Sequence, residues 1–201
     1  MAYITGLFDN YDEAADAVRA LEEAGISSDN ISLISNNTDG RYAGDALKGD
    51  DGAVTGAETG AGLGAVAGGG AGLLTGLGLL SIPGVGPVVA GGWLTATLVG
   101  LVGGATAGGV TGGIVGALVD TGVPEEEAQA YSEAVRRGSA LVAVRCDETQ
   151  RGKVEAILDD WGRVDIGQRR DAYLEEGWES FNASAAPYTA DEIERERQRW
   201  G

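Results

Sequence analysis

GAGLGAVAGGGAGLLTG, residues Gly60–Gly76, has a glycine at every fourth position. Of the 35 glycines in this 201-residue chain, 23 lie between Gly52 and Gly116, and the 61 residues from Thr59 to Val119 include no charged side chain. One turn of an α-helix takes about 3.6 residues, so a four-residue period places the glycines in one stripe along a helix. Such a stripe lets a second helix pack at a short axial distance. The spacing therefore predicts glycine-zipper helices, because a flexible linker has no reason to keep it.

The same period appears on both sides of a break rich in proline and glycine. The break is Ser81-Ile-Pro-Gly-Val-Gly-Pro87, which is typical of one helix ending and another beginning. We therefore expect an inserted helical hairpin, with arms from about Ala53 to Leu80 and from about Val88 to Val119. The glycines expected to mediate helix packing and oligomerisation are Gly56, Gly60, Gly64, Gly68, Gly72, Gly76, Gly92, Gly100, Gly104, Gly108, Gly112 and Gly116.

The hairpin is compatible with two environments. At ~1.5 Å per residue each arm is about 40 Å long or more, enough to cross a bilayer core of ~30 Å. The flanks are acidic, however, and give no positive-inside signal that would orient the arms in a membrane. A helical pair buried within an oligomer accounts for the missing charges equally well. Both interpretations stay open at the level of sequence.

The residues before the hairpin predict a strand, a helix and a second strand. Tyr3–Phe8 is short and apolar, and Ile31–Ser35 is its counterpart. Between them, Asn10 and Glu13 form a capping box at the start of a helix that ends at Gly25. Its apolar residues recur at the spacing of one helix face: Ala14, Ala17, Val18 and Leu21.

The residues after the hairpin predict two further helices and two further strands. One helix begins at Pro124 and is followed by Ala140–Cys146 (ALVAVRC), the most strand-like run of the chain. A second helix begins at Asp147 or Thr149 and ends at Gly162, and Arg163–Ile166 is expected to form a short last strand.

These elements together predict an α+β fold. Four strands and two crossover helices in this order, with the hairpin and one extra helix inserted mid-chain, are typical of a ferredoxin-like split βαβ domain. We expect its halves at residues 1–51 and 120–166, the glycine-zipper hairpin inserted at residues 52–119, and a polar tail at residues 167–201 that ends in a helix. Neither half has enough residues to fold alone, so the two are expected to pack together.

The tail combines charged residues with scattered aromatic side chains. Thr189 and Glu192 form another capping box, which predicts a terminal helix of mixed charge. A solvated helix is the simpler interpretation. A strap that docks onto a neighbouring subunit is the alternative, since aromatic side chains are common anchors of interfaces. The possible docking anchors are Trp178, Phe181, Tyr188 and Trp200.

The composition excludes several classes of function. A net charge of −17 opposes nucleic-acid binding, which needs a basic face. The absence of His removes Ser-His-Asp catalysis and His-based metal sites, and Cys146 is the single Cys. Asp45, Asp50 and Asp51 could hold a cation weakly, but a solvated acidic linker is the preferred interpretation. We therefore predict no catalytic residue, no cofactor and no metal site.

Several segments of the flanks resemble the prokaryotic heat-induced general stress protein family. They are Ile4-Thr-Gly-Leu-Phe-Asp9, Ala24-Gly-Ile26, Asn30-Ile-Ser-Leu-Ile34, Gly122-Val-Pro-Glu-Glu-Glu-Ala128 with Tyr131, and Arg137-Gly-Ser-Ala-Leu-Val142. The tail from Pro187 to Arg197 is similar to the tails of some members. In that family the two halves commonly flank a glycine-rich hydrophobic segment. The resemblance implies an association with general stress responses, and it implies no reaction, cofactor or catalytic residue.

The sequence therefore predicts a non-enzymatic, stress-associated structural protein. Its partner is expected to be itself, because the two glycine stripes offer more packing faces than one hairpin needs. The product would be a large homo-oligomer. The alternative is a membrane-associated stress protein with the hairpin embedded in the lipid bilayer and the head in the cytoplasm. No signal peptide is apparent at the N-terminus, so we expect a cytoplasmic location, with membrane association as the open variant.

Overall fold

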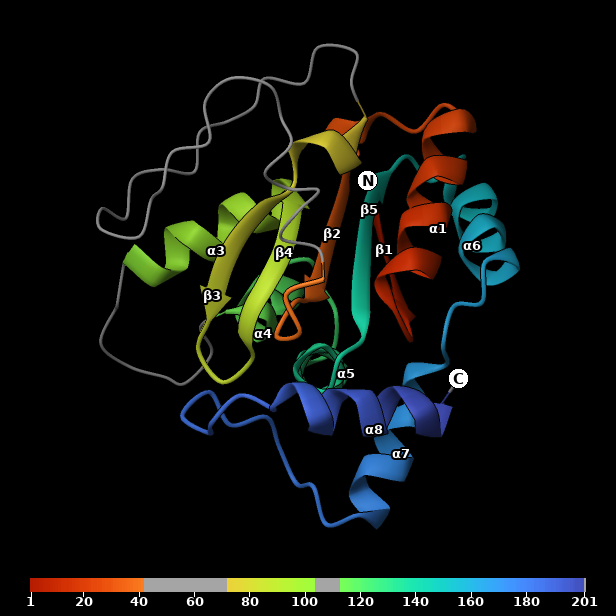
Figure 1. Cartoon of the computed structure of the whole chain (residues 1–201). Coiled ribbons are helices and arrows are strands. Elements are labelled where there is room, and N and C mark those ends of the chain that lie inside the picture. The colour runs from red at the N-terminus through yellow and green to blue at the C-terminus, as the bar shows by residue number, and fades with distance from the viewer. Residues whose placement is uncertain (42–71, 104–112, 201) are drawn as a thin grey trace.

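The computed structural model describes residues 1–41, 72–103 and 113–200 (Figure 1). Over these residues the protein is a mixed α+β fold with one antiparallel sheet of five strands, in the order β1-β5-β2-β4-β3, and seven α-helices. The strands are β1 (Ala2–Phe8), β2 (Ile31–Asn36), β3 (Gly78–Ile82), β4 (Gly86–Gly92) and β5 (Ala140–Cys146). The helices are α1 (Tyr11–Glu23), α3 (Trp93–Gly103), α4 (Ile114–Val119), α5 (Glu125–Arg136), α6 (Arg151–Asp160), α7 (Ile166–Glu175) and α8 (Ala190–Trp200), with two 3₁₀ turns, η1 (Ser28–Asn30) and η2 (Leu73–Gly76).

The centre of the sheet is built from both ends of the chain. β5 pairs antiparallel with β1 on one side and with β2 on the other, so β1 and β2 run in the same direction with β5 between them. β5 is buried along almost its whole length, as its run of apolar and β-branched residues predicts. Helix α1, which connects β1 to β2, begins at the predicted cap, where the Asn10 side chain accepts a hydrogen bond from the Glu13 amide at 3.0 Å.

Each face of the sheet is covered by its own helices, because successive side chains of a strand point to opposite faces. Ile4 and Phe8 of β1 belong to the core under α1, α6 and η2. Leu7, on the other face, belongs to the core under α3, α4, α5 and α7. The result is a three-layer arrangement, with α7 and α8 along one end of the sheet (Figure 1).

The predicted helical hairpin is wrong between residues 73 and 92. Residues Gly78–Ile82 and Gly86–Gly92 form a β-hairpin, and β4 pairs with β2, so the hairpin extends the central sheet. Val88, Val89 and Ala90 are buried in it on alternating faces, and Pro83-Gly84-Val85 makes the turn, with Gly84 at φ +76°. Short β-branched runs beside a Pro-Gly turn are strand signals, and here they outweigh the four-residue glycine period.

The remaining parts of the two predicted arms have different outcomes. In the second arm, α3 and α4 are helical as predicted. The rest of both arms, residues 53–71 and 104–112, lies outside the described residues. Of the described helices, none is both long and apolar enough to cross a membrane.

The predicted last strand, Arg163–Ile166, is also wrong. Only one bridge forms there, between Val164 and Leu7, whose carbonyl accepts a hydrogen bond from the Val164 amide at 2.8 Å. The segment cannot continue as a strand because α7 begins at Ile166. The Asp165 side chain caps that helix by accepting a hydrogen bond from the Gln168 amide at 3.0 Å.

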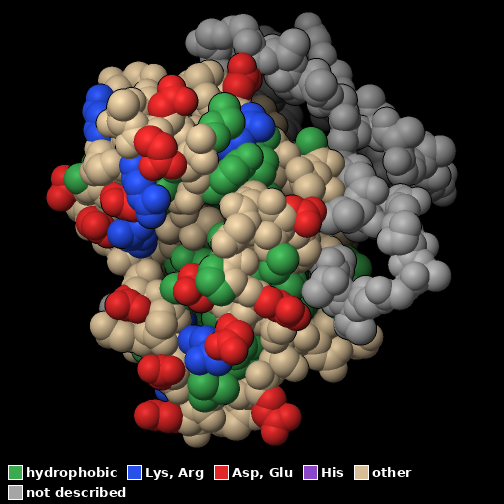
Figure 2. All heavy atoms as spheres, turned by 180° about the vertical axis from the view of Figure 1, so that it is seen from behind, with side chains coloured by type: hydrophobic (Ala, Val, Ile, Leu, Met, Phe, Trp, Pro, Cys, Tyr) green, Lys and Arg blue, Asp and Glu red, His purple; other side chains and the backbone are tan. Residues whose placement is uncertain are grey.

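The surface carries the excess of acidic residues. Figure 2 shows Asp and Glu side chains spread over the face that is turned away in Figure 1, with Lys and Arg gathered in few places. The chain has 31 Asp and Glu against 14 Lys and Arg. Two copies of the molecule therefore repel each other over most of their surfaces.

Gly92 lies where β4 and the start of α3 approach β2, and its substitution tests how close that approach is. It has φ +90°, and a Cβ there would contact the Ile31 carbonyl and lie 2.6 Å from the Ser32 hydroxyl. Gly25 has the same φ but open space around it. We expect Gly25→Ala to cost about 1 kcal/mol of unfolding free energy and Gly92→Ala at least ~2 kcal/mol more. Urea unfolding of both variants measures the difference, and equal losses would contradict the close approach.

Candidate functional site

The C-terminal tail packs on the domain through three contacts. Ile193 of α8 is fully buried against Gly138, where a Cβ would lie 2.6 Å from the Ile193 side chain. The loop before α8 lies against the β3–β4 turn, because a Cβ on Gly84 would be 2.7 Å from Ala183. The third contact is a group of three arginines, two buried and one partly buried, between α5, α7 and α8. We call it the arginine cluster: Arg137, Arg169 and Arg197 with the acidic and aromatic side chains that they contact.

Arg137, at the end of α5, has the largest number of partners in the arginine cluster. Its Nε donates to Glu133 at 2.9 Å, and its Nη1 donates to Glu176 at 2.7 Å. Its guanidinium also lies over the ring of Tyr173, 4.1 Å from the centroid. The Arg137 side chain is 8% exposed and that of Glu133 is 1% exposed, so this ion pair is buried. Removal of Arg137 would leave the buried Glu133 with Arg136 as its cation, at 3.2 Å, so a buried charge would lose its closer partner in a region of low dielectric constant.

The other two arginines connect the tail to the N-terminal half of the chain. Arg169 of α7 donates to Asp9 at 2.6 Å and stacks on the ring of Trp200 at 3.9 Å. Arg197 of α8 donates to Asp39 at 2.6 Å. Residues of the last helices thus bind carboxylates that follow β1 and β2, which fixes α7 and α8 at this end of the sheet.

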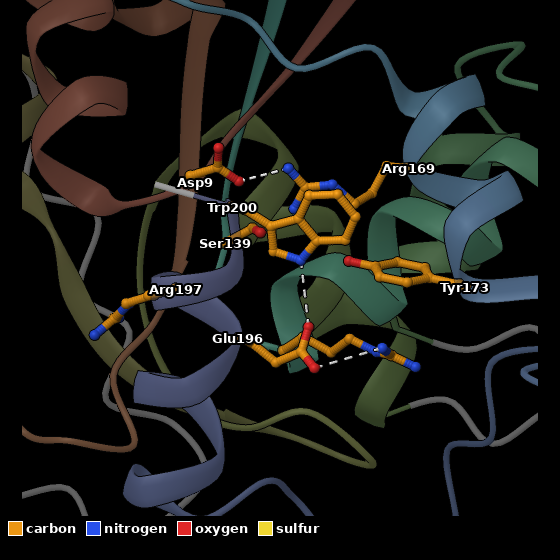
Figure 3. Close-up of a pocket in the computed structure, with 8 residues that line it drawn as sticks. Asp9, Ser139, Arg169, Tyr173, Glu196, Arg197 and Trp200 are labelled. Carbon is orange, nitrogen blue, oxygen red and sulfur yellow. Dashed lines mark hydrogen bonds and ion pairs between the residues drawn. The ribbon is translucent and has the colours of Figure 1, made fainter. Parts of the chain in front are cut away.

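A small hole lies in the middle of the arginine cluster (Figure 3). The Tyr173 hydroxyl points into this region, is buried, and has no hydrogen-bond partner within the described part of the chain. The hole measures about 10 Å³, which is room for one water molecule. Its lining residues are Asp9, Arg137, Ser139, Arg169, Tyr173, Glu196, Arg197 and Trp200. Its size and its paired charges suit a structural contact and leave no space for an organic substrate.

Burial dominates the acid–base behaviour of Tyr173. It raises the pKa of the phenol to about 12, against a smaller lowering by the positive charges of Arg169 and Arg137. The phenol is therefore neutral at every physiological pH and cannot act as a base there.

The four predicted docking anchors contact the protein's own domain. Trp178, Phe181 and Trp200 pack, partly buried, against the core under α5. Tyr188 lies beneath Arg136, 4.9 Å from the guanidinium to the ring centroid. In this structure they fix the tail in place, and their contact with a neighbouring subunit stays a prediction.

The predicted packing glycines are spread over different structures. Gly56, Gly60, Gly64, Gly68, Gly104, Gly108 and Gly112 lie outside the described residues. Gly72 and Gly76 begin and end η2, and Gly92 ends β4. Gly100 and Gly116 are in α3 and α4. A four-residue stripe along a single helix is therefore not formed by the described members of the set.

The sequence analysis missed the free edge of the sheet at β3. Nothing in the described part of the chain pairs with the outer side of this strand. Gly78-Leu-Leu-Ser-Ile82 has no charged side chain, and Leu79 is 43% exposed. An edge strand without a charge or a bulge is a template for pairing with another strand. The signal was present in the sequence as a short apolar run before a Pro-Gly turn.

Comparisons with known proteins identify no relative, so the function is argued from the geometry of the chain. No protein-family model, no curated protein and no solved structure matches this chain.

Removal of Arg137 tests the buried ion pair. We expect Arg137→Met to cost about 3 kcal/mol of unfolding free energy, because the buried Glu133 loses its closer cation and is left with Arg136 at 3.2 Å. The double variant Glu133→Gln/Arg137→Met is expected to recover more than 1 kcal/mol of that loss. The matched control is Arg151→Met, whose bond to Glu155 has a similar length of 3.0 Å but joins exposed side chains, and it should cost less than about 1 kcal/mol. Equal losses at both arginines would show that the Arg137 pair contributes no more than a surface pair.

The pKa of Tyr173 predicts a loss of stability in alkali. The unfolded phenol ionises near pH 10 and the folded one near pH 12, so this contribution is complete below pH 10 and is lost between pH 10 and 12. A pKa difference of two units between the folded and unfolded states corresponds to about 2–3 kcal/mol of unfolding free energy. We expect Tyr173→Phe to match the wild type near pH 8 and to lose less unfolding free energy over this window. Parallel curves for the two proteins would contradict the assignment.

Proposed function

We propose that this protein is a non-enzymatic structural subunit that assembles with copies of itself into a large homo-oligomer. The observation that carries the proposal is the exposed, uncharged edge strand β3, at the end of the sheet in a chain of net charge −17. The backbone amides and carbonyls on the outer side of this edge lack partners in the described structure, and a strand from a second copy can supply them.

Charge restricts where two copies can meet. Acidic residues dominate the surface, as Figure 2 illustrates for one face. β3 lies within the 61 residues that include no charged side chain, so two molecules can approach there without a like charge in the contact. Like-charge repulsion elsewhere disfavours other modes of association and gives the contact its specificity.

The glycine period supports the same proposal from a different part of the chain. The glycines at residues 56–68 and 104–112 keep the four-residue spacing that lets helices pack closely. We propose that they form a glycine zipper that adds to the assembly. We also propose that β1-α1-β2 and α5-β5-α6 are the two halves of a ferredoxin-like split βαβ domain, since β5 lies between parallel β1 and β2. The resemblance of the flanks to general stress proteins supports a role in stress.

A lysine on the edge strand tests the proposal. Ser81 of β3 is exposed, and Ser81→Lys puts a positive charge where a second strand would pair. Charged edge residues are a common way in which proteins prevent such pairing. We expect the wild type to sediment as a large species and Ser81→Lys to shift to the 20.4 kDa monomer in analytical ultracentrifugation.

The control keeps the charge change and moves it off the edge. Ser27 is exposed, and its side chain makes no capping hydrogen bond at η1. Ser27→Lys should therefore assemble like the wild type. A wild-type protein that stays monomeric across the micromolar range would overturn the proposed function itself.

A further inference from the structure

The opposite edge of the sheet, at β1, is also incomplete. Val164 pairs with Leu7 through a single bridge, and its amide donates to the Leu7 carbonyl. Backbone groups of alternate residues point to the same side of a strand, so those of Thr5 and Tyr3 point outward beside Leu7. Within the described residues no hydrogen bond reaches them from that side. The edge from Ala2 to Gly6 is thus open over five residues.

A groove of about 290 Å³ lies directly against this open edge. Its lining residues are Thr5, Tyr131, Asp159, Arg163, Val164, Asp165 and Ile166. Its volume is just below the ~300 Å³ at which small-molecule sites begin, so it has room for a side chain. Val164 and Ile166 in the lining, with the half-exposed ring of Tyr3 on the same face of β1, suit an aliphatic side chain.

Both carboxylates of the groove already have partners. Asp159 is bound by Arg163, whose Nη2 is 2.7 Å from the carboxylate oxygen, and Asp165 accepts the hydrogen bond that caps α7. Neither carboxylate therefore needs a ligand to satisfy it. A charged ligand would gain little, whereas an uncharged strand meets no buried, unpaired charge.

The Tyr131 hydroxyl in the groove has a hydrogen that it can donate. The Thr5 hydroxyl donates to the Tyr131 hydroxyl at 3.0 Å, and Tyr131 is 5% exposed. Burial, its largest cause, raises the pKa of Tyr131, so the phenol keeps its hydrogen. That hydrogen has no acceptor in the described part of the chain and can be donated to a group entering the groove. A peptide carbonyl is such a group.

We propose that the β1 edge and its groove accept β3 of a second copy of this chain, so that the subunits join head to tail. The inference rests on the proposed self-assembly and names its two contact surfaces. β3 is five residues long, as is the open edge, and it has no charge. One of its two leucines enters the groove while its backbone pairs with Tyr3 and Thr5. Each copy then has a free β3 and a free β1 edge, so the contact is heterologous and the chain of subunits continues.

The test is a complementation between two variants that each lose one surface. Ser81→Lys disables β3 and keeps the β1 edge. Thr5→Arg fills the groove with a long side chain beside Asp159 and Asp165 and keeps β3. We expect each variant alone to be monomeric and their equimolar mixture to form a 1:1 complex of twice the monomer mass. Light scattering after size-exclusion chromatography measures both masses, and circular dichroism melting confirms that each variant is folded.

Other outcomes separate the two proposals. Assembly of Thr5→Arg at the wild-type size, with Ser81→Lys monomeric, would overturn the head-to-tail contact and leave assembly through β3 intact. Two monomeric variants that do not combine would also overturn it. A monomeric wild type would overturn the proposed function together with this inference. If Thr5→Arg does not fold, Thr5→Pro replaces it, because it removes the outward amide, which β5 does not use.

Discussion

The insertion of β5 between β1 and β2 is the interaction on which the rest of the structure depends. β1 and β2 share one partner, β5 (residues 140–146), so the two flanks of the chain fold as one unit. Asn36, at the end of β2, holds the segment just before β5 in place. It is fully buried, and its side-chain amide donates to the carbonyls of Val135 and Arg136 at 3.1 and 3.3 Å. The chain therefore leaves β2 at Asn36 and comes back to the same residue at the end of α5.

This constraint explains why the glycine-rich segment extends the sheet. β2 has β5 on one side only, and an open edge at the middle of a domain would leave backbone groups buried without partners. β4 supplies them, and its glycines allow the approach: a Cβ on Gly91 would lie 2.8 Å from Leu77, so η2 packs directly on the strand. Gly91 lies outside the four-residue series, so the close contact between the 3₁₀ turn and the strand depends on a glycine that the helix period does not mark.

Most elements of the flanks could be predicted from the sequence because each has a local signal. The short apolar run of β1, the cap at Asn10 and the apolar run of β5 depend only on neighbouring residues. The strand expected at Arg163–Ile166 is the exception, because α7 begins there. The β3–β4 hairpin has a signal in its Pro-Gly turn, but an uncharged stretch of Gly, Ala, Leu and Val has no polar face, so its strand period could not be separated from the glycine period of a helix. The arginine cluster could not either. Arg169 and Asp9 are far apart in the sequence, and nothing local marks a charged residue that folding will bury.

The distribution of charge connects the arginine cluster to the free edges. Arg137 and Arg169 are almost fully buried, so two of the few cations neutralise internal carboxylates and contribute little to the surface. The tail is fixed by these pairs and by Ile193, which orders the end of the sheet without using either edge strand. Over the described residues, the acidic exterior is interrupted by β3 and by the groove at β1. In the proposed assembly, repulsion over the exterior and backbone pairing at the edges would act together, because the first removes competing contacts and the second requires a strand of defined length and no charge.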